Sequence, residues 1–351
     1  MTLGEPVAWS SARRIRSFAR VSCLLLVRFS SIGDVLLTTP LLRALRTRHP
    51  DAQLVFVTKQ AMAPLVSDNP HLTRVETLAP GEPLRALARR LAALGPTRGL
   101  DLHGSLRSRA LRLLVPCSWR GYSKRKLARG MLVSTKIDLY RRSVPLPVAE
   151  RYFEAARGLD VQPDDAPPQF FLGDAARARV ARWTAERGLD DRPLAVLAPG
   201  AAHFTKRWPV DGWIALAEQL RARGYGIAVA GGPDDRALAE PLAPYAVSAV
   251  GEFGLQETGA LLARARIAIS GDSGVMHMAT GVGTPVVALF GPTVQQFGFF
   301  PYSTKAIVLQ RDLDCRPCTT MGGPRCPMGH HRCLKDITSD DVARAVERLV
   351  A

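Results

Sequence analysis

The chain has 351 residues, 47% of them hydrophobic, a length that suggests two globular domains. No apolar run approaches the ~20 residues that a membrane-spanning helix needs. The formal net charge of +16 comes from the first part of the chain, because residues 1–160 hold 27 Lys and Arg against 11 Asp and Glu, whereas the remainder holds 20 of each. Eleven basic residues and one acid fall between Ser105 and Arg142. This face is expected to attract polyanions: nucleic acid, an anionic membrane or a phosphorylated ligand.

Residues 1–20 are interpreted as a basic N-terminal extension before the first strand. They run into a short apolar segment that resembles the core of a signal peptide. The core is too short, Arg28 closes it, and no small-residue cleavage site follows. A twin-Arg export signal at Arg13 and Arg14 is the alternative interpretation.

From residue 22 onward, strand-like and helix-like segments alternate. We expect strands at 22–29, 52–59 and 98–105, and helices at 36–50 and 83–94. Within the first helix, Thr39 is a candidate N-cap and Pro40 a candidate first residue. Such alternation predicts a parallel sheet covered by helices on both faces.

A stretch rich in Pro and Asp, residues 158–174, is the best candidate linker, and the alternation restarts after it. The last helix is expected at 339–351, with Ser339 or Asp340 as its cap. The predicted elements between these two segments are strands at 193–200, 225–235, 266–274 and 284–293 and helices at 211–224, 255–265 and 275–283. The fold class is therefore α/β, with two doubly wound parallel-sheet domains in tandem, and ligands are expected at the carboxyl ends of the strands.

The turn ISGDSG is the strongest candidate site. A strand ends at Ser270, and Gly271 and Gly274 permit close backbone approach to a ligand. A helix then begins with free N–H groups, which suits a diphosphate. His277 lies four residues after Ser273, on the same helix face. A capped helix with a buried histidine is the alternative.

A second turn, LAPGAAHFTKRWP, follows another predicted strand. Lys206 in this turn is a candidate for neutralising phosphate, although the turn matches no Walker motif. The alternative is a surface loop anchored by Trp208. In a third and weaker turn, AVAGGPDDR, Asp234 is a candidate contact for a ribose or adenine edge.

Asp34 stands at the corner between the first strand and the first helix. A carboxylate placed there, across from the phosphate-binding turns, is suited to taking a proton from an incoming hydroxyl. A helix cap would look the same in the sequence.

Four cysteines cluster near the C-terminus. One C-x-x-C pair with two further cysteines and two histidines suggests a structural zinc site. The spacing of the second pair is irregular, so we favour reduced cysteines that serve only packing and keep structural zinc as the alternative. Disulfides are not expected without an export signal. The clustered residues are Cys315, Cys318, Cys326 and Cys333.

Taken together, the motifs closely resemble glycosyltransferase family 9, the heptosyltransferases of lipopolysaccharide core synthesis. The resemblance runs from about residue 21 to the C-terminus, and the cysteine-rich tail looks more like the heptosyltransferase II branch than the heptosyltransferase I branch. It is carried, in chain order, by VRFSSIGDVLLTTPLLRALR, DLHGSLRSR, LAPGAAHFTKRWP, GDSGVMHMATGVGTPVVALFGPT and CRPC…CPMGHHRCL.

The resemblance implies a GT-B fold, with two Rossmann-like domains facing across a cleft: an acceptor domain at 21–165 and a nucleotide-sugar donor domain at 166–351. The last helix is expected to pack back on the first domain. The resemblance also implies inverting, metal-independent transfer of heptose from ADP-heptose to a lipid A–core acceptor, with Asp34 as general base and no required cofactor. The implied donor-binding residues are Ser31, Gly33, Gly200, Lys206, Phe253, Asp272, Ser273, Gly274, Val275 and His277.

In these roles Ser31 and Gly33 approach the diphosphate, Lys206 and the helix start at 273–275 bind it, Asp272 and His277 contact the sugar, and Phe253 borders the adenine. The basic first domain suits an anionic glycolipid acceptor at the inner face of the cytoplasmic membrane. A cytoplasmic, peripheral location follows from this interpretation, and no nucleic-acid partner is expected. The candidate acceptor contacts are Arg107, Arg109, Lys124 and Arg125.

Two other functions stay open from the sequence. The same family accommodates another nucleotide sugar or another surface-glycan acceptor. A basic nucleic-acid-binding protein is the remote alternative, but few aromatic residues interleave with the basic run.

Overall fold

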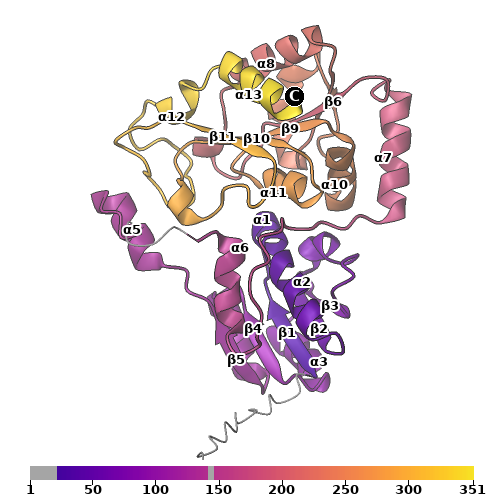
Figure 1. Cartoon of the computed structure of the whole chain (residues 1–351), viewed down its shortest axis with the longest axis vertical. Coiled ribbons are helices and arrows are strands. Elements are labelled where there is room, and N and C mark those ends of the chain that lie inside the picture. Colours follow the sequence, from indigo (N-terminus) through magenta and orange to yellow (C-terminus); the bar gives the residue numbers. More distant parts are fainter. Residues whose placement is uncertain (1–21, 141–145) are drawn as a thin grey trace, which may run out of the picture.

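The computed structural model describes residues 22–140 and 146–351. The predicted N-terminal extension lies outside these residues. Among the helices that the structure describes, none has the length and apolar character to cross a bilayer. Two α/β units are stacked along the long axis of the molecule (Figure 1).

The first unit is built on a five-stranded parallel sheet in the order β3-β2-β1-β4-β5. The strands are β1 (Cys23–Val27), β2 (Gln53–Lys59), β3 (Arg74–Leu78), β4 (Arg98–Asp101) and β5 (Ser118–Gly121). All five residues of β1 are buried, as expected of a central parallel strand that is covered on both faces. The chain reverses direction in the sheet between β1 and β4, and this is where such sheets bind ligands.

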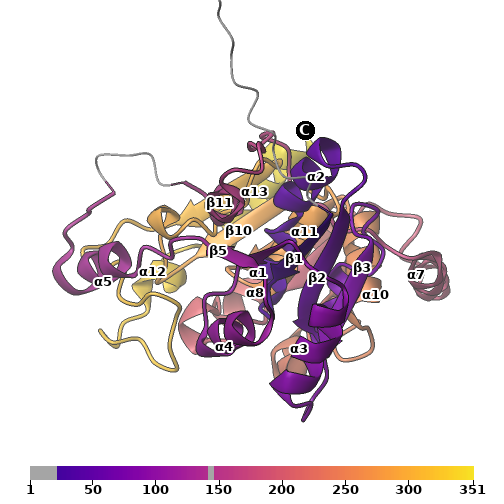
Figure 2. The ribbon, with the colours of Figure 1, turned by 90° about the horizontal axis from the view of Figure 1, so that it is seen from below.

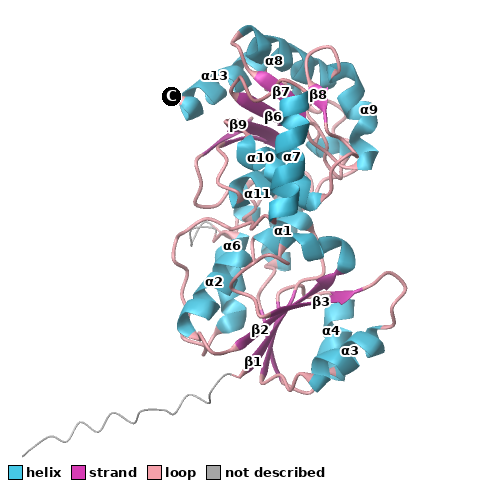
Figure 3. Cartoon of the chain, turned by 90° about the vertical axis from the view of Figure 1, so that its right-hand side faces the viewer, coloured by secondary structure: helices cyan, strands magenta, loops and turns pink. Residues whose placement is uncertain are grey.

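Helices cover both faces of this sheet. Figure 3 shows α2 and α6 on one side of it and α3 and α4 on the other. The N-cap of α2 is Thr38, and Thr39 is its first helical residue, so the predicted cap was displaced by one position. The helical elements are α1 (Ile32–Leu36), α2 (Thr39–Arg48), η1 (Gln60–Leu65), α3 (Leu84–Ala93), α4 (Leu106–Leu114), α5 (Lys126–Thr135), α6 (Val148–Arg151) and η2 (Tyr152–Ala156).

The second unit has six parallel strands in the order β11-β10-β9-β6-β7-β8. Counted within this unit, that is the dinucleotide-binding order 3-2-1-4-5-6, with its reversal between β6 and β9. The strands are β6 (Leu194–Ala198), β7 (Gly226–Val229), β8 (Val247–Ser248), β9 (Ile267–Gly271), β10 (Val286–Phe290) and β11 (Ala306–Gln310). The helical elements are α7 (Asp174–Glu186), η3 (Phe204–Lys206), α8 (Val210–Ala222), η4 (Pro233–Asp235), α9 (Arg236–Ala239), η5 (Glu240–Leu242), α10 (Leu255–Arg264), α11 (Gly274–Gly281), η6 (Gln295–Phe297), α12 (Arg332–Lys335) and α13 (Ser339–Val350).

The last helix, α13, lies beside α8 on the second sheet. Its apolar residues Val342, Val346 and Leu349 belong to the same buried cluster as Trp213 of α8. The prediction that this helix packs back on the first domain was therefore wrong. Its N-cap was also misplaced, because Thr338 accepts the Asp341 N–H at 3.2 Å and Ser339 is already helical.

The two units meet where α1 lies against α11. Glycine makes this approach possible, because a Cβ on Gly33 would lie 2.2 Å from the His277 ring and one on Gly274 would lie 2.8 Å from Cβ of Ile32. The predicted linker runs past this contact. The Gln169 N–H donates to the Thr39 hydroxyl at 2.8 Å, and the next residue donates to the Gly281 carbonyl at 2.7 Å. The switch points of the two sheets therefore face one another.

Candidate functional site

Asp34 lies in the first turn of α1, immediately after the corner that follows β1. The Ser31 hydroxyl donates to its Oδ2 atom at 2.7 Å, and the Ser31 N–H is 3.4 Å from the same oxygen. Asp34 therefore does contribute to capping α1, as the alternative interpretation expected. Its other oxygen, Oδ1, points to a different partner.

That partner is Arg28, whose Nη2 lies 2.6 Å from Asp34 Oδ1. Arg28 is 6% exposed, and its Nη1 donates to the Leu102 carbonyl at 2.6 Å, which fixes the guanidinium between β1 and β4. The Tyr152 hydroxyl completes the surroundings of the carboxylate at 3.4 Å. Burial by itself would raise the pKa of Asp34, but the Arg28 charge and the Ser31 hydrogen bonds outweigh it and hold the pKa below its usual range.

Two further groups reach this corner from other elements. His103 follows β4, and its ring lies edge-on to Phe29 with centroids 5.7 Å apart. Burial, with the charges of Arg28 and Lys124, lowers the pKa of His103 to about 4, so the ring is neutral at pH 7. Lys124 approaches the turn before α4, where its Cε is 3.2 Å from the Cβ position of Gly104. Burial lowers the pKa of Lys124, and Arg28 adds to this effect.

Sequence reasoning missed both Arg28 and His103 as site residues. Arg28 follows the apolar run of β1 directly and is buried with its charge, and a buried charge needs a partner. An arginine at the end of a buried strand, six residues before a lone acid, was the signal available. His103 lies within the DLHG motif that helped to identify the family.

The four predicted acceptor contacts have different surroundings. Lys124 lies near the Asp34 corner, whereas Arg125 is 3.7 Å from Glu154. Arg107 lines a cavity of about 680 Å³ beside the carboxyl ends of β2 and β3, together with Lys59. Arg109 is exposed on α4. Their roles stay predictions.

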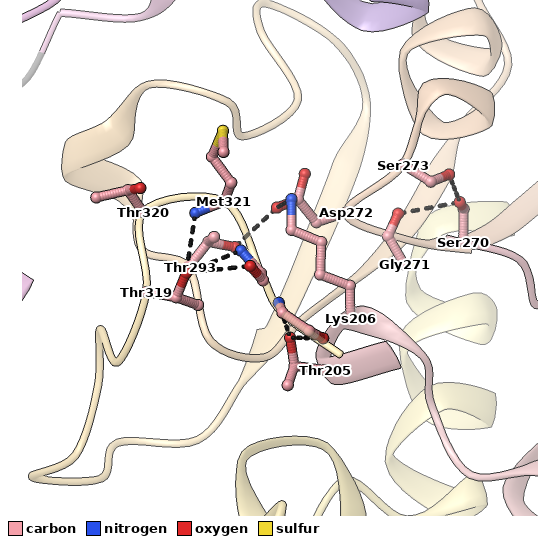
Figure 4. A network of polar contacts seen from close by, with 12 residues as sticks. Thr205, Lys206, Ser270, Gly271, Asp272, Ser273, Thr293, Thr319, Thr320 and Met321 are labelled. Carbon is pink, nitrogen blue, oxygen red and sulfur yellow. Dashed lines mark hydrogen bonds and ion pairs between the residues drawn. The ribbon is translucent and has the colours of Figure 1, made fainter. Parts of the chain in front are cut away.

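In the second unit, Lys206 ends η3 and its Nζ lies 2.6 Å from Asp272 Oδ2 (Figure 4). The Thr293 hydroxyl donates to the same oxygen at 2.7 Å. The sequence assigned Lys206 to phosphate and Asp272 to sugar, and the structure brings them into contact with each other. The pair is largely buried, with side-chain exposures of 15% and 8%, and it lies at the carboxyl edge of the sheet.

Ser273 is the N-cap residue of α11. Its hydroxyl lies 2.9 Å from the Ser270 hydroxyl, as Figure 4 shows, and makes no capping hydrogen bond to the helix. The first N–H groups of α11, at Gly274 and Val275, therefore lack a side-chain cap. This helix terminus lies against Ile32 of α1, so an anion bound here would lie close to the Asp34 corner.

His277 is buried at 4% exposure on the face of α11 that meets Gly33. Within the described ranges its Nδ1 has no hydrogen-bond partner. Burial lowers the pKa of His277, and although Asp272 and Asp34 act in the opposite direction, the net shift is downward. The ring is neutral at pH 7 and offers an unused polar atom at the meeting of the two units.

Gly200 and Phe253 occupy different settings. A Cβ on Gly200 would lie 2.3 Å from the Asp235 carboxylate, so only glycine lets the turns after β6 and β7 touch. Phe253 is 8% exposed and lies edge-on to Trp183 at 5.1 Å, in contact with the core beneath α7. A role for either residue in binding adenine or phosphate stays a prediction.

The cysteine-rich segment, residues 315–333, forms hydrogen bonds to the turn that carries Lys206. The Thr205 hydroxyl accepts the Gly323 N–H at 2.8 Å, and His331 Nε2 donates to the Thr205 carbonyl at 3.1 Å. All six cysteines are unbridged. Across residues 22–140 and 146–351, no three His, Cys, Asp or Glu side chains are arranged to hold a metal ion, so the geometry gives the zinc hypothesis no support.

Known proteins resemble this chain along most of its length. The model of glycosyltransferase family 9 (heptosyltransferase) matches residues 84–328. Lipooligosaccharide heptosyltransferase 2 of Haemophilus influenzae is 27% identical, with 93% of this chain and 99% of the relative covered. Lipopolysaccharide heptosyltransferase 1 of Pseudomonas aeruginosa is 30% identical, with 84% and 85% covered. The solved structure of E. coli ADP-heptose lps heptosyltransferase II superposes with a TM-score of 0.72 at 26% identity, over 93% of this chain and 98% of that one.

Proposed function

Because this chain belongs to glycosyltransferase family 9, the heptosyltransferases, and has their GT-B fold, we propose that it transfers heptose from ADP-heptose to the inner core of nascent lipopolysaccharide. The observation that carries the proposal is the meeting of α1 and α11. It places a buried, ionised carboxylate from one unit opposite an uncapped helix N-terminus and a lysine from the other.

Asp34 acts as the general base. Its carboxylate accepts the proton of the acceptor hydroxyl while that oxygen bonds to the anomeric carbon of the heptose. The bond from this carbon to the diphosphate oxygen breaks on the opposite face, and ADP leaves with the electron pair. A single displacement of this kind inverts the anomeric configuration. Arg28 fixes the carboxylate and keeps it unprotonated, so it is ready to accept at neutral pH.

The leaving diphosphate is stabilised from the second unit. The N–H groups at the start of α11 and the ammonium of Lys206 are aimed at the place where negative charge develops. Lys206 reaches the diphosphate by exchanging its contact with Asp272 for one with phosphate oxygen, which leaves Asp272 free to accept a sugar hydroxyl. These groups supply the needed charge stabilisation without a metal ion.

The acceptor is an anionic lipid A–core intermediate, bound by the first unit at the inner surface of the cytoplasmic membrane. The basic excess of residues 1–160 supports this partner, because lipid A and its first sugars carry phosphates and carboxylates. Lys124 meets an acidic group of the acceptor, and its position near the Asp34 corner supports this role.

The proposal is tested by turnover. Purified protein is incubated in EDTA with ADP-heptose and a heptose-deficient lipid A–core acceptor, and the product is weighed by mass spectrometry. We expect the gain of one heptose. ADP-glucose and UDP-sugars serve as matched donors, and transfer from one of them in place of ADP-heptose would overturn the donor assignment.

A further inference from the structure

Helix α4 turns apolar side chains away from the protein. Leu106 and Leu113 are 84% and 90% exposed. Their spacing of seven residues places both on one face of the helix. Leu111 and Ser108 are buried on the other face, toward the sheet. The outward leucines therefore contribute nothing to the core, and each would gain free energy by leaving water.

Exposed basic side chains also lie on α4. Arg107 and Arg109 are exposed, and within the described part of the chain neither has a carboxylate at ion-pair distance, whereas Arg112 lies 3.9 Å from Asp101. A helix with outward leucines and unpaired arginines differs from an ordinary solvated helix, whose outer face is polar.

The start of α5 also exposes an apolar and a basic side chain. Leu127 is 86% exposed and its neighbour Lys126 is also exposed. The loop before α5 touches the loop before α4, because Lys124 lies beside Gly104. Figure 2 shows α5 at the edge of the molecule beside α12 of the second unit, where Arg129 and Lys136 donate to carbonyls of residues 315–320, and the start of α5 stays exposed.

We propose that the outer face of α4, together with the start of α5, docks on an anionic phospholipid bilayer. Charge complementarity supports this docking. Nine basic residues and one acid fall within the described part of this region, residues 105–140, whereas the chain after residue 160 is neutral overall, so an anionic surface attracts the first unit. The leucines then enter the interface between headgroups and acyl chains, as the apolar face of an interfacial helix does.

This docking orients the site as well as holding the protein. The cavity beside β2 and β3 is lined by Leu106 and Arg107, so it adjoins the docking face. A lipid-anchored acceptor would approach the carboxyl edge of the first sheet from the bilayer. The inference rests on the proposed function for its biological meaning, but the binding test below uses neither donor nor acceptor.

The test is sedimentation of the full chain with vesicles of phosphatidylcholine alone or mixed with phosphatidylglycerol. We expect binding only to the anionic vesicles, weakened by salt. Leu106→Ser with Leu113→Ser should weaken binding by about tenfold or more. Arg107→Gln and Arg109→Gln should each weaken it by about fivefold. Matched controls in the second unit are Met328→Ser, which removes a side chain of 60% exposure, and Arg344→Gln with Arg348→Gln, and these should bind like the unaltered protein.

Equal binding by the leucine variant and the unaltered protein would overturn the proposal. A dimer in solution that the leucine variant abolishes would overturn it too, because the face would then join two copies of the chain. Leu113→Ser should retain transfer to a soluble core oligosaccharide released from lipid A. Vesicle binding without any heptose transfer would contradict the proposed function and leave the docking surface standing.

Discussion

Two carboxylate–cation pairs face each other across the two units, and both have a nitrogen–oxygen distance of 2.6 Å. Arg28 is held by a carbonyl of its own sheet in addition to Asp34, and it is almost fully buried. Lys206 stands at the end of a short helical turn, its Nζ paired with Asp272, and the turn itself is held by a neighbouring segment. The comparison motivates the proposal that the Arg28 pair stays together during the reaction, whereas the Lys206 pair opens when a diphosphate binds.

Loss of the base should have the largest effect. Asp34→Asn keeps the shape but cannot accept a proton, and general base catalysis is worth about 10² to 10⁴ in rate. We expect turnover to fall by that factor while calorimetry shows unchanged ADP binding. Asp164→Asn, at an exposed carboxylate paired with Arg43, is the matched control and should retain full turnover. Wild-type turnover in Asp34→Asn would remove Asp34 from the mechanism.

Loss of the Lys206 charge should have the second-largest effect. Lys206→Met removes the charge that offsets the leaving group, and we expect turnover to fall by about 10² to 10³. ADP affinity should also fall, unlike in the Asp34 variant. Lys305→Met, at an exposed lysine of the same unit, should change neither quantity. Unchanged kcat with weaker ADP binding would assign Lys206 to binding alone.

Removing the ion pair between Arg28 and Asp34 should change the pH dependence of kcat/KM. In Arg28→Met burial still raises the pKa of Asp34 but the lowering charge is gone, so the acid limb of kcat/KM should move up by about 1–3 pH units. Because the folded pKa is below the unfolded one, the ionised carboxylate stabilises the fold at neutral pH, and that stability is lost as pH falls through the folded pKa. Arg28→Lys, which keeps the charge and the fold, should have an intermediate limb. An unmoved limb in both variants would separate Arg28 from the state of Asp34.

A larger side chain at Gly33 should disturb the contact between α1 and α11. Gly33→Ala places a Cβ 2.2 Å from the His277 ring, and we expect a loss of about 1–3 kcal/mol of stability in thermal unfolding together with slower turnover. Gly130→Ala, in a helix with open space around it, is the control and should be at least as stable as the unaltered protein. The double change Gly33→Ala with His277→Ala should recover stability, and failure to do so would place the strain elsewhere.

The smallest effect is expected far from both pairs. Thr338→Ala removes the cap of α13 and should cost about 1 kcal/mol in chemical denaturation with no change in turnover. A loss of activity would mean that α13 acts on the first unit after all.

Much of the architecture was predictable because local patterns and global topology agree. Runs such as CLLLV are apolar on both faces, which suits only central parallel strands, and the glycine-rich corners follow them directly. The family resemblance then supplied the pairing of the two units. The helix caps were missed by one residue because Thr38, Thr39, Thr338 and Ser339 are all acceptable caps, and only tertiary packing selects among them.

The remaining site features depend on contacts between distant parts of the chain. Arg28 meets Leu102 across 74 residues, and the cysteine-rich segment meets Thr205 across 118. No periodicity in the sequence encodes such contacts. The position of α13 was missed for the same reason, since it depends on the buried cluster that this helix shares with Trp213.

The stereochemistry of transfer tests the proposed mechanism most directly. Nuclear magnetic resonance of the product of a reaction run in EDTA gives the anomeric configuration of the new glycosidic bond. A single displacement with Asp34 as base predicts a configuration opposite to that of the heptose in the donor. Retention of the donor configuration would contradict this mechanism, because it needs either two displacements or attack from the face of the leaving diphosphate, and a base on the opposite face serves neither.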